Sequence, residues 1–531
     1  MNRLLRASGL LLLVGALVWL ATLWQWQTSG RDVSMADIVV QLLLLPVLLV
    51  AAFLVAAWAI KRMRQPPVVA SSSLGTAAAP TPSTPPPEVS LPRAWVVAQA
   101  VNAPGADDVA ALWRVVQGGD ALPTLDPELT DAQGLPIFSG RGQQDDPIAE
   151  ALQAPDEGAS TWPTPADGLP WSVGAQRALW RLKPVLAQLL EALHALPQAD
   201  DPAQTTPGGR PELFEPASNH LSGVARAVTP AMVQAQADRA PVLTVRLILP
   251  AVWRDAERDA AVNWVRVQAA EVLDWAKAQR AQGIRWVTET LPEPDQLWAE
   301  LNQLLVQWSR EARPQACLLL SCDSALDPDR VAQWEATGTL FTAQHQRGRV
   351  PGEAAAGALL VHHAWPGLDG PHPDHKPVCL LAPLQARRDK SADAVGRVGH
   401  QHLLALLQAT QRLAMPSGWT EELLLITDAD HRASRVGELY EALQEAAPAL
   451  DPDTQVMRLG SVCGDLGQAR PVVMLALTAA SLGQEPSWTT ALAVLLHDAR
   501  DRAVLPLVRS WPPVAAPEPS PAEAAADAVP A

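Results

Sequence analysis

The chain has 531 residues, 48% of them apolar, and a formal net charge of −16. Residues 1–64 carry a net charge of +4, so the rest of the chain carries −20. Phosphate backbones repel so acidic a domain, which argues against nucleic acid as a partner. The length suffices for two to four ordinary domains, and the apolar share suffices for a large core.

Two uncharged apolar runs open the sequence, at residues 7–24 and 38–60. At a rise of about 1.5 Å per residue, each run is long enough to cross about 30 Å of hydrocarbon. We therefore predict that 1–64 is a membrane anchor of two transmembrane helices, with a kink at Pro46 in the second. The first run could instead be a signal peptide, but no small-x-small cleavage site follows it.

The basic residues predict how this anchor is oriented. Arg3 and Arg6 precede the first run and three basic residues follow the second within 61–64, whereas the loop between the runs holds only Arg31. The positive-inside rule then places both termini and the main domain in the cytoplasm of a bacterium, with the anchor in the inner membrane. The lipid bilayer is thus one predicted partner, and the four cysteines are expected to be reduced thiols.

Residues 65–92 contain eight prolines and a single charged residue, Glu88. Such a segment cannot bury a core, so we predict a Pro-rich linker that is partly extended polyproline II. The last residues, 513–531, are rich in Ala, Pro and Glu, which predicts a disordered tail.

Strand and helix patterns alternate between the linker and the tail. Runs of apolar and β-branched residues predict strands, and apolar residues at helical spacing predict helices. The predicted strands are 95–100, 242–249, 284–289, 317–321, 356–362, 378–384, 423–427, 456–462, 490–497 and 503–509. The predicted helices are 174–196, 261–280, 295–310, 392–413, 434–445 and 469–482.

This alternation predicts an α/β domain whose mostly parallel sheets are covered by helices on both faces. The pattern occurs twice, and each series ends in two strands without a helix between them. We therefore predict two βαβαβαββ halves, the first over 93–376 with long loops and the second over 377–512.

Two such halves, each closed by a strand pair, resemble the plan of the thiolase-like fold, the superfamily of the β-ketoacyl synthases. Short motifs over roughly 240–510 carry the same resemblance. The segment 347–361 (RGRVPGEAAAGALLV) resembles the PGEGAAALLL segment that precedes the last strand of the first half in those enzymes. Residues 322–324 (CDS) lie where the family has a strand ending in Asp-Ser, and 463–469 (CGDLGQA) resembles the glycine-rich turn before the last helix.

The resemblance implies condensing chemistry, which needs a cysteine thiolate at the N-terminus of the helix after the third strand of the first half. The junction found there, 288–296, has no cysteine and carries Glu293 and Asp295, which would raise the pKa of a nearby thiol. In the glycine-rich turn, the family's His or Asn corresponds to Asp465, a carboxylate that opposes developing negative charge. His431 is a candidate for the family's other histidine.

We therefore predict a degenerate relative without a catalytic site, with Cys322, His431 and Asp465 as the residues to test. Cys322 could be a nucleophile, but a buried thiol at a strand end is the favoured interpretation. Histidines and aspartates crowd 362–375, where a solvated linker fits the Gly and Pro content better than a metal site does. Because no CxxC, GxSxG, Walker, HExxH or GxGxxG motif is present, we predict neither a metal nor a cofactor.

The anchor, the long spacer and the missing nucleophile together predict a membrane-tethered, non-catalytic scaffold or interaction module in a bacterial envelope-associated assembly, such as a secretion system. Two alternatives stay open: an acyl-condensing or acyl-transfer enzyme with an atypical active site, and a cargo adaptor or chaperone for a secretion system. The expected partners are other membrane or envelope-machine proteins, and the resemblance also implies a homodimer.

Overall fold

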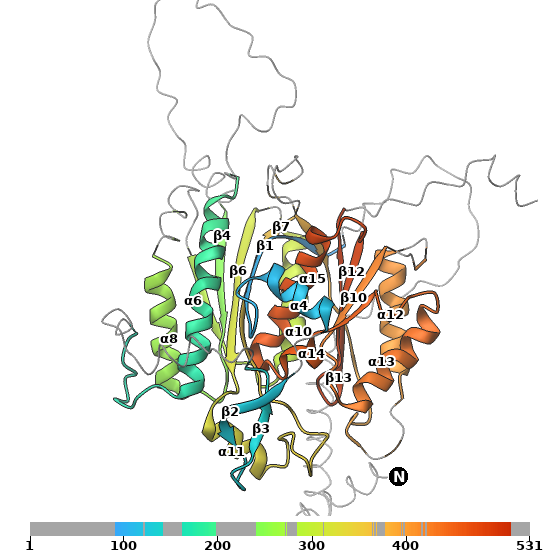
Figure 1. Cartoon of the computed structure of the whole chain (residues 1–531). Coiled ribbons are helices and arrows are strands. Elements are labelled where there is room, and N and C mark those ends of the chain that lie inside the picture. Colours follow the sequence, from blue (N-terminus) through green and yellow to red (C-terminus); the bar gives the residue numbers. More distant parts are fainter. Residues whose placement is uncertain are drawn as a thin grey trace, which may run out of the picture. The chain divides into compact units, whose positions relative to one another are not determined.

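The structure is a computed structural model of the whole chain (Figure 1). With a few single residues between the ranges, it describes 91–119, 123–141, 162–197, 241–270, 284–311, 313–363, 377–394, 399–415 and 422–510. Both predicted transmembrane runs lie outside these ranges, and so do the linker up to residue 90 and the tail. Within them, no helix combines the length and the apolar character that a membrane crossing requires.

Along the sequence, the strands of the main sheet run from β1, which follows the linker, to β13, which precedes the tail. In chain order they are β1 (Arg93–Asn102), β4 (Val242–Ile248), β5 (Ile284–Glu289), β6 (Gln315–Ser324), β7 (Glu353–His362), β8 (Val378–Leu381), β9 (Leu384–Arg387), β10 (Leu423–Thr427), β11 (Val456–Arg458), β12 (Thr490–Leu495) and β13 (Asp501–Val508). A separate hairpin consists of β2 (Thr124–Thr130) and β3 (Pro136–Ser139).

Helices cover both faces of the sheet, and some of them lie between its two halves. They are α4 (Val109–Gly118), α6 (Val173–His194), α8 (Asp255–Gln268), α10 (Leu297–Arg310), α11 (Pro328–Ala336), α12 (Gln401–Ala414), α13 (Ala433–Ala446), α14 (Leu459–Cys463) and α15 (Arg470–Gln484). Single 3₁₀ turns precede α10 (η3, Pro294–Gln296) and α15 (η4, Gly467–Ala469).

The main sheet consists of two equivalent halves. Their strand orders are β5-β4-β6-β7-β1 and β11-β10-β12-β13-β8. In each half four strands run in one direction, while β7 or β13 is antiparallel to both of its neighbours. Because β1 and β8 pair antiparallel, a local two-fold axis relates one half to the other. The predicted duplication of one α/β unit is therefore confirmed.

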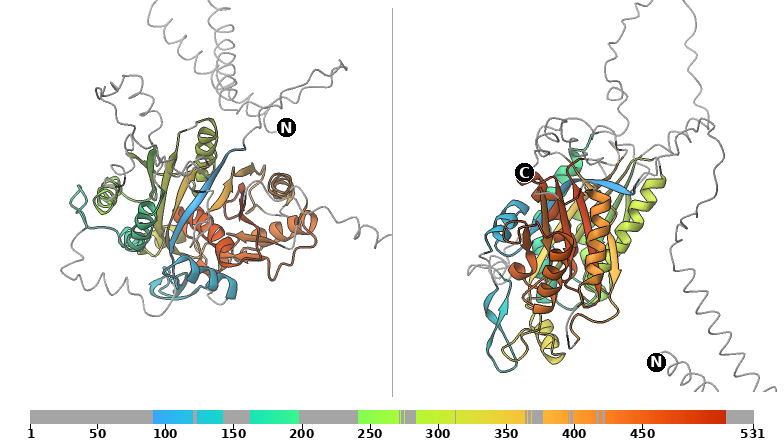
Figure 2. Two further views of the ribbon diagram at one scale, coloured as in Figure 1. Left: turned by 90° about the horizontal axis from the view of Figure 1, so that it is seen from above. Right: turned by 90° about the vertical axis from the view of Figure 1, so that its right-hand side faces the viewer.

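Three hydrophobic cores separate these layers. Along β6, Cys317 and Leu319 point into the core that holds α4, α10 and α15. The alternate residues Leu318, Leu320 and Cys322 point to the opposite face, where α6 and α8 pack. The third core joins α12 and α13 to the outer face of the second half. In Figures 1 and 2, α10 and α15 accordingly lie between the two half-sheets.

Several predicted boundaries are corrected by the structure. The strand predicted at 456–462 ends at Arg458, because Leu459–Cys463 forms the short helix α14. Gly460 there packs so closely on the backbone of Asp428 that an added Cβ would lie 2.2 Å from its carbonyl oxygen. The helix predicted at 392–413 begins only at Gln401, and the strand predicted at 378–384 is divided between β8 and β9.

Three elements of the first half are absent from the prediction: α4, α11 and the β2–β3 hairpin. Buried and exposed residues alternate along β3 but not along β2, and Leu129 and Ile137 on the inner side of the hairpin pack with Leu340. Its outer side exposes Leu125 and Phe138, which are directly opposite each other across the two strands.

Candidate functional site

The glycine-rich turn predicted from the sequence connects α14 to α15. Its Gly467 has a φ of +52°, and an added Cβ would lie 1.9 Å from a carboxylate oxygen of Asp323. That carboxylate, at the end of β6, accepts the backbone N–H of Gln468 at 2.8 Å and pairs with Arg330 at 2.6 Å. Only glycine fits such a turn, so the first half of the fold holds the turn of the second half in place.

A second contact fixes the other end of the same turn. The backbone N–H of Asp465 donates to the carbonyl of Val350 at 2.8 Å. Gly140 and Gly352 approach the carbonyl oxygen of Cys463 so closely that a Cβ on either would lie 2.2 or 2.3 Å from it. Asp465 is thereby held in a defined place at the head of α15, where it is 3% exposed.

Arg470, the first residue of α15, is the centre of a buried cluster of charged groups. Its guanidinium lies 3.1 Å from Asp295 in η3, 3.2 Å from Asp428 and 3.5 Å from Asp465. His497, two residues after the end of β12, places Nε2 3.2 Å from Asp465. Three carboxyl groups from both halves of the fold thus share one guanidinium.

Several buried polar atoms of this cluster make no well-aligned hydrogen bond in the described part of the chain, although Arg470 Nε lies 3.2 Å from Asp428 and His497 Nε2 lies 3.2 Å from Asp465. They are Oδ2 of Asp295, Oδ2 of Asp428, Oε1 of Gln468, Nε of Arg470 and Nε2 of His497. Buried polar groups normally find a partner, so each exception calls for a physical explanation. Five such atoms gather around Arg470, whereas the charged side chains elsewhere in the described residues that have one, Arg181, Arg246, Glu289 and Arg330, have one each.

The excess of carboxyl groups shifts the ionisation of Asp428. Burial raises its pKa to about 7; Arg470 opposes that shift and Asp295 adds to it. One oxygen of Asp428 accepts the backbone N–H groups of Leu496 and His497 at 2.6 and 3.1 Å. A buried carboxyl group with a pKa near neutrality can hold or release a proton at physiological pH.

Asp465 is shifted in the opposite direction. Burial alone would raise its pKa, but His497, Arg349 and Arg470 keep it well below its usual range. Burial lowers the pKa of His497 to about 4, so this ring is neutral at pH 7. Arg349 and Arg470 are therefore the charges that balance the Asp465 carboxylate.

All four cysteines are buried free thiols. Cys322 is fully buried, and its side chain points from β6 toward α6, on the face opposite the Arg470 cluster. Burial, with Asp323 adding to it, raises its pKa well above the usual range. Cys463 is closest to the cluster along the chain, but burial raises its pKa to about 12.

His431 does not join the Arg470 cluster; Asp428, three residues earlier, is the side chain that does. His431 is exposed, and its ring packs edge to face against Phe341 with a centroid distance of 4.8 Å. It lines a pocket of about 290 Å³ that reaches Asp465 and Asp430 and has Phe138 and Phe341 on its apolar side. The pocket gives the cluster its contact with the surface.

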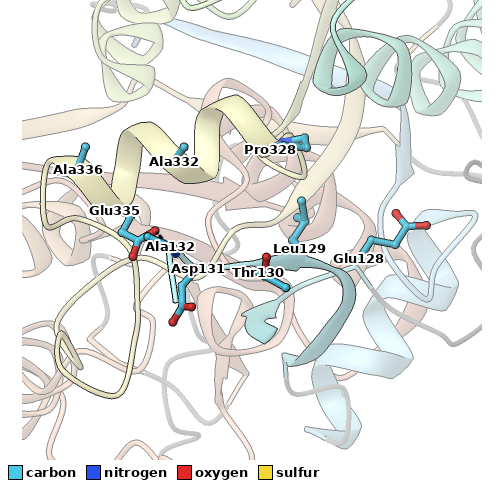
Figure 3. Close-up of a pocket in the computed structure, with 9 residues that line it drawn as sticks. All are labelled: Glu128, Leu129, Thr130, Asp131, Ala132, Pro328, Ala332, Glu335 and Ala336. Carbon is cyan, nitrogen blue, oxygen red and sulfur yellow. Dashed lines mark hydrogen bonds between the residues drawn. The ribbon is translucent and has the colours of Figure 1, made fainter. Parts of the chain in front are cut away.

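A second hollow, of about 410 Å³, lies between the end of β2 and helix α11 (Figure 3). Its carboxyl groups are already bonded: Glu335 accepts the backbone N–H of Ala132 at 2.8 Å, and Asp131 accepts that of Leu135 at 2.8 Å. Glu128 pairs with Arg141 at 3.1 Å. This hollow therefore lies at the packing contact between the hairpin and α11.

Within the described residues, no group of three or more His, Cys, Asp and Glu side chains could hold a metal ion. Of the crowded segment 362–375, His362 lies 2.9 Å from the carbonyl oxygen of Trp308 and is buried. Asp369, His372, Asp374 and His375 lie outside the described residues.

Sequence reasoning identified Asp465 and Asp295 but missed Asp428, Arg470 and His497. The missed signal is positional: Asp428 and His497 each follow directly, or within two residues, the end of a fully buried strand. Polar groups at the carboxyl ends of adjacent parallel strands meet at one edge of a sheet. β10 and β12 are such neighbours.

Comparisons with known proteins found similar solved structures but no relative by sequence. No protein-family model matches the chain, and no curated protein matches it by sequence. Similar solved structures include an ishigamide ketosynthase/chain length factor (14% identity, 78% of this chain and 99% of that one, TM-score 0.44). Others are the type II PKS ketosynthase complex AntDE:AntF (11%, 79% and 99%, 0.47) and Xanthomonas campestris OleA with cerulenin (10%, 79% and 97%, 0.36).

The duplicated strand order defines the fold. Two five-stranded halves, each closed by an antiparallel strand pair and related by a local two-fold axis, define a thiolase-like α/β protein. The described part of the chain therefore has the predicted thiolase-like α/β fold.

Proposed function

We propose that this protein is a membrane-tethered, non-catalytic thiolase-like scaffold or interaction module in a bacterial envelope-associated assembly, such as a secretion system. The single observation that supports it best is the Arg470 cluster. At the head of α10, where the resemblance implies a thiolate, Asp295 is ion-paired with Arg470 at 3.1 Å.

Electrostatics explain why this cluster opposes condensing chemistry. A thiolate or an oxyanion needs nearby donors or positive charge. Asp295, Asp428 and Asp465 together outnumber the guanidinium groups of Arg470 and Arg349, so a further negative charge would be repelled. The cluster is instead suited to binding a proton and to joining the two halves of the fold.

The tether belongs to the same proposal. The apolar runs at 7–24 and 38–60 would anchor the chain in the inner membrane, with the main domain in the cytoplasm. Fusing alkaline phosphatase or green fluorescent protein after residue 30, and separately after residue 64, tests this orientation. The proposal expects phosphatase activity only for the first fusion point and fluorescence only for the second; the reverse pattern would overturn the cytoplasmic placement.

Co-purification tests the scaffold role. The tagged full-length chain is extracted from membranes in mild detergent, and stoichiometric companions are identified by mass spectrometry. The scaffold role predicts envelope or secretion-machine subunits without acyl carriers. Acyl carrier proteins or fatty-acid enzymes at equal stoichiometry would contradict it. A single secreted cargo would instead support the adaptor or chaperone alternative.

One observation favours the enzyme alternative. Asp428, with its pKa of about 7, has the ionisation expected of a general acid or base, and the 290 Å³ pocket reaches the neighbouring Asp430 and Asp465. An acyl-transfer enzyme with an atypical site would use such a group. If Cys322 were its nucleophile, the wild-type chain would form an acyl thioester and the Cys322→Ala variant would not.

A further inference from the structure

Three aromatic rings from separate elements line up along the 290 Å³ pocket. Phe138 of β3 packs edge to face on Phe341 at a centroid distance of 5.7 Å, and Phe341 packs in the same way on His431 at 4.8 Å. The whole chain has only four phenylalanines, and two of them are here. Phe138 is 40% exposed, although a large apolar ring gains free energy from burial.

The apolar surface continues beyond the pocket onto the hairpin. Leu125, the cross-strand partner of Phe138, is 57% exposed. Pro123 and Val350 complete the apolar wall inside. An exposed apolar rim around a small cavity is the arrangement in which a partner's anchor side chain becomes a binding hot spot.

The carboxylates at the pocket are paired with arginines, whereas one arginine at the pocket has no carboxylate partner among the described residues. Asp430 pairs with Arg432 at 2.8 Å, and Asp465 lies 3.4 Å from Arg349 as well as close to Arg470. These two carboxylates are therefore already balanced. Arg458, which also lines the pocket and is half-buried, has no ion-pair partner in the described part of the chain.

A second cation extends this positive rim. His431 lines both this pocket and a neighbouring hollow of about 530 Å³ that also contains Arg347. Arg347 is exposed and has no ion-pair partner among the residues described. Most of the chain is strongly acidic, so two unpaired arginines beside an aromatic pocket form a local site for negative charge.

We propose that this pocket binds a segment of a partner protein that carries an apolar anchor side chain flanked by acidic residues. The anchor enters between Phe138 and Phe341, and the flanking carboxylates reach Arg458 and Arg347. This inference rests on the proposed role as an interaction module and names the surface and the chemistry that the partner must present.

A phage-displayed library of random dodecapeptides, panned against the purified full-length chain in detergent, tests the proposal. The expected enriched sequences share one large apolar residue within three positions of an Asp or Glu. One enriched peptide is then labelled with fluorescein, and its affinity is measured by fluorescence polarisation. A matched peptide with Lys in place of the acidic residues should bind at least about tenfold more weakly.

Variants locate the binding surface. Phe341→Ala and Arg458→Glu should each lower the affinity for the labelled peptide by about tenfold or more. Phe138→Ser, at a partly exposed position, tests the aromatic wall if Phe341→Ala fails to fold. The matched controls are Leu135→Ala, an exposed apolar residue at the hairpin tip that does not line the pocket, and Arg285→Glu, an exposed arginine on β5. Both controls should leave the affinity unchanged.

Each outcome has one meaning. Enrichment of basic peptides, or affinities that survive Phe138→Ser and Arg458→Glu, would overturn this docking site while leaving the non-catalytic role intact. Displacement of the peptide by an acyl thioester at equal affinity would also overturn it and would favour the enzyme alternative. Loss of peptide binding after removal of residues 511–531 would mean that binding requires this protein's own C-terminal segment, which contradicts the proposal.

Discussion

The molecule contains two buried clusters of charged groups that differ in how their charges are matched. In one, Glu353 of β7 receives the guanidinium groups of Arg177 and Arg181 from α6 at 2.6 Å, and Ser324 donates to it at 2.9 Å. In the other, three carboxyl groups surround Arg470; among the described residues only one of them, Asp465, has a second arginine nearby, and five polar atoms make no well-aligned hydrogen bond, against one in the first cluster. The first is an arrangement that fastens a helix to a sheet, whereas the second carries an unresolved excess of negative charge.

The two clusters also respond oppositely to pH. The two arginines lower the pKa of Glu353 to about 2, although burial alone would raise it, whereas the pKa of Asp428 is raised to about 7. Glu353 therefore contributes stability that is present above about pH 4.5 and is lost as the pH falls toward 2. Asp428 costs stability progressively as the pH rises from about 4 to 7.

Removing the centre of the well-matched cluster should have the largest effect. Glu353→Ala leaves two buried guanidinium groups without their carboxylate, which costs about 3–5 kcal/mol of unfolding free energy. Chemical denaturation of the variant at pH 7 measures this cost. Glu335→Gln, on a surface helix, is the control and should change stability by less than about 1 kcal/mol. A cost for Glu353→Ala as small as that of the control would mean that the cluster is not a structural fastening.

The glycine-rich turn beside Arg470 should be the next most sensitive position. Gly467→Ala combines a left-handed φ with a Cβ 1.9 Å from the Asp323 carboxylate, which Arg330 and the Gln468 amide hold in place. We expect a loss of about 2–4 kcal/mol. Gly338→Ala has a similar φ of +64° but open space around the new Cβ, so it should cost about 1 kcal/mol. Equal losses would show that the contact with Asp323 contributes nothing.

Neutralising Asp428 should have a smaller effect whose size depends on pH. Asp428→Asn keeps an oxygen for the amides of Leu496 and His497 but removes the charge that burial opposes. Relative to wild type, the variant should gain stability as the pH rises from 4 to 7 and then stay level. Urea unfolding at four pH values, with exposed Asp329→Asn as control, measures this slope. A difference that is independent of pH would refute the raised pKa.

The sequence predicted most of the fold because buried strands such as 423–427 are continuous apolar runs and the edge strand 284–289 is rich in β-branched and aromatic residues. The strands at 284–289 and 423–427 match their predicted bounds, and the duplicated series follows from their order. The β2–β3 hairpin escaped prediction because Pro127 and several polar residues interrupt its alternation. The sequence signals for helix α11 are Asp327, whose side chain caps it, and Pro328 in its first turn.

The candidate site was less predictable, because its members come from loops that meet only in three dimensions. Asp465 could be found from the glycines around it. Arg470 carries no local pattern, since a single cation at a helix start is unremarkable in sequence and unfavourable to the helix dipole. His431 was preferred to Asp428 because the family comparison called for a histidine, whereas the fold directs Asp428 inward.

Acylation of the purified full-length chain tests the central claim most directly. The protein is incubated with an acyl-CoA and, separately, with an acylated carrier protein, and its intact mass is measured before and after treatment with hydroxylamine. We predict an unchanged mass in both cases, because no thiol faces the Arg470 cluster and its carboxyl groups oppose a thiolate. A hydroxylamine-sensitive acyl adduct that disappears in Cys322→Ala or Cys463→Ala would contradict the account and establish an enzyme.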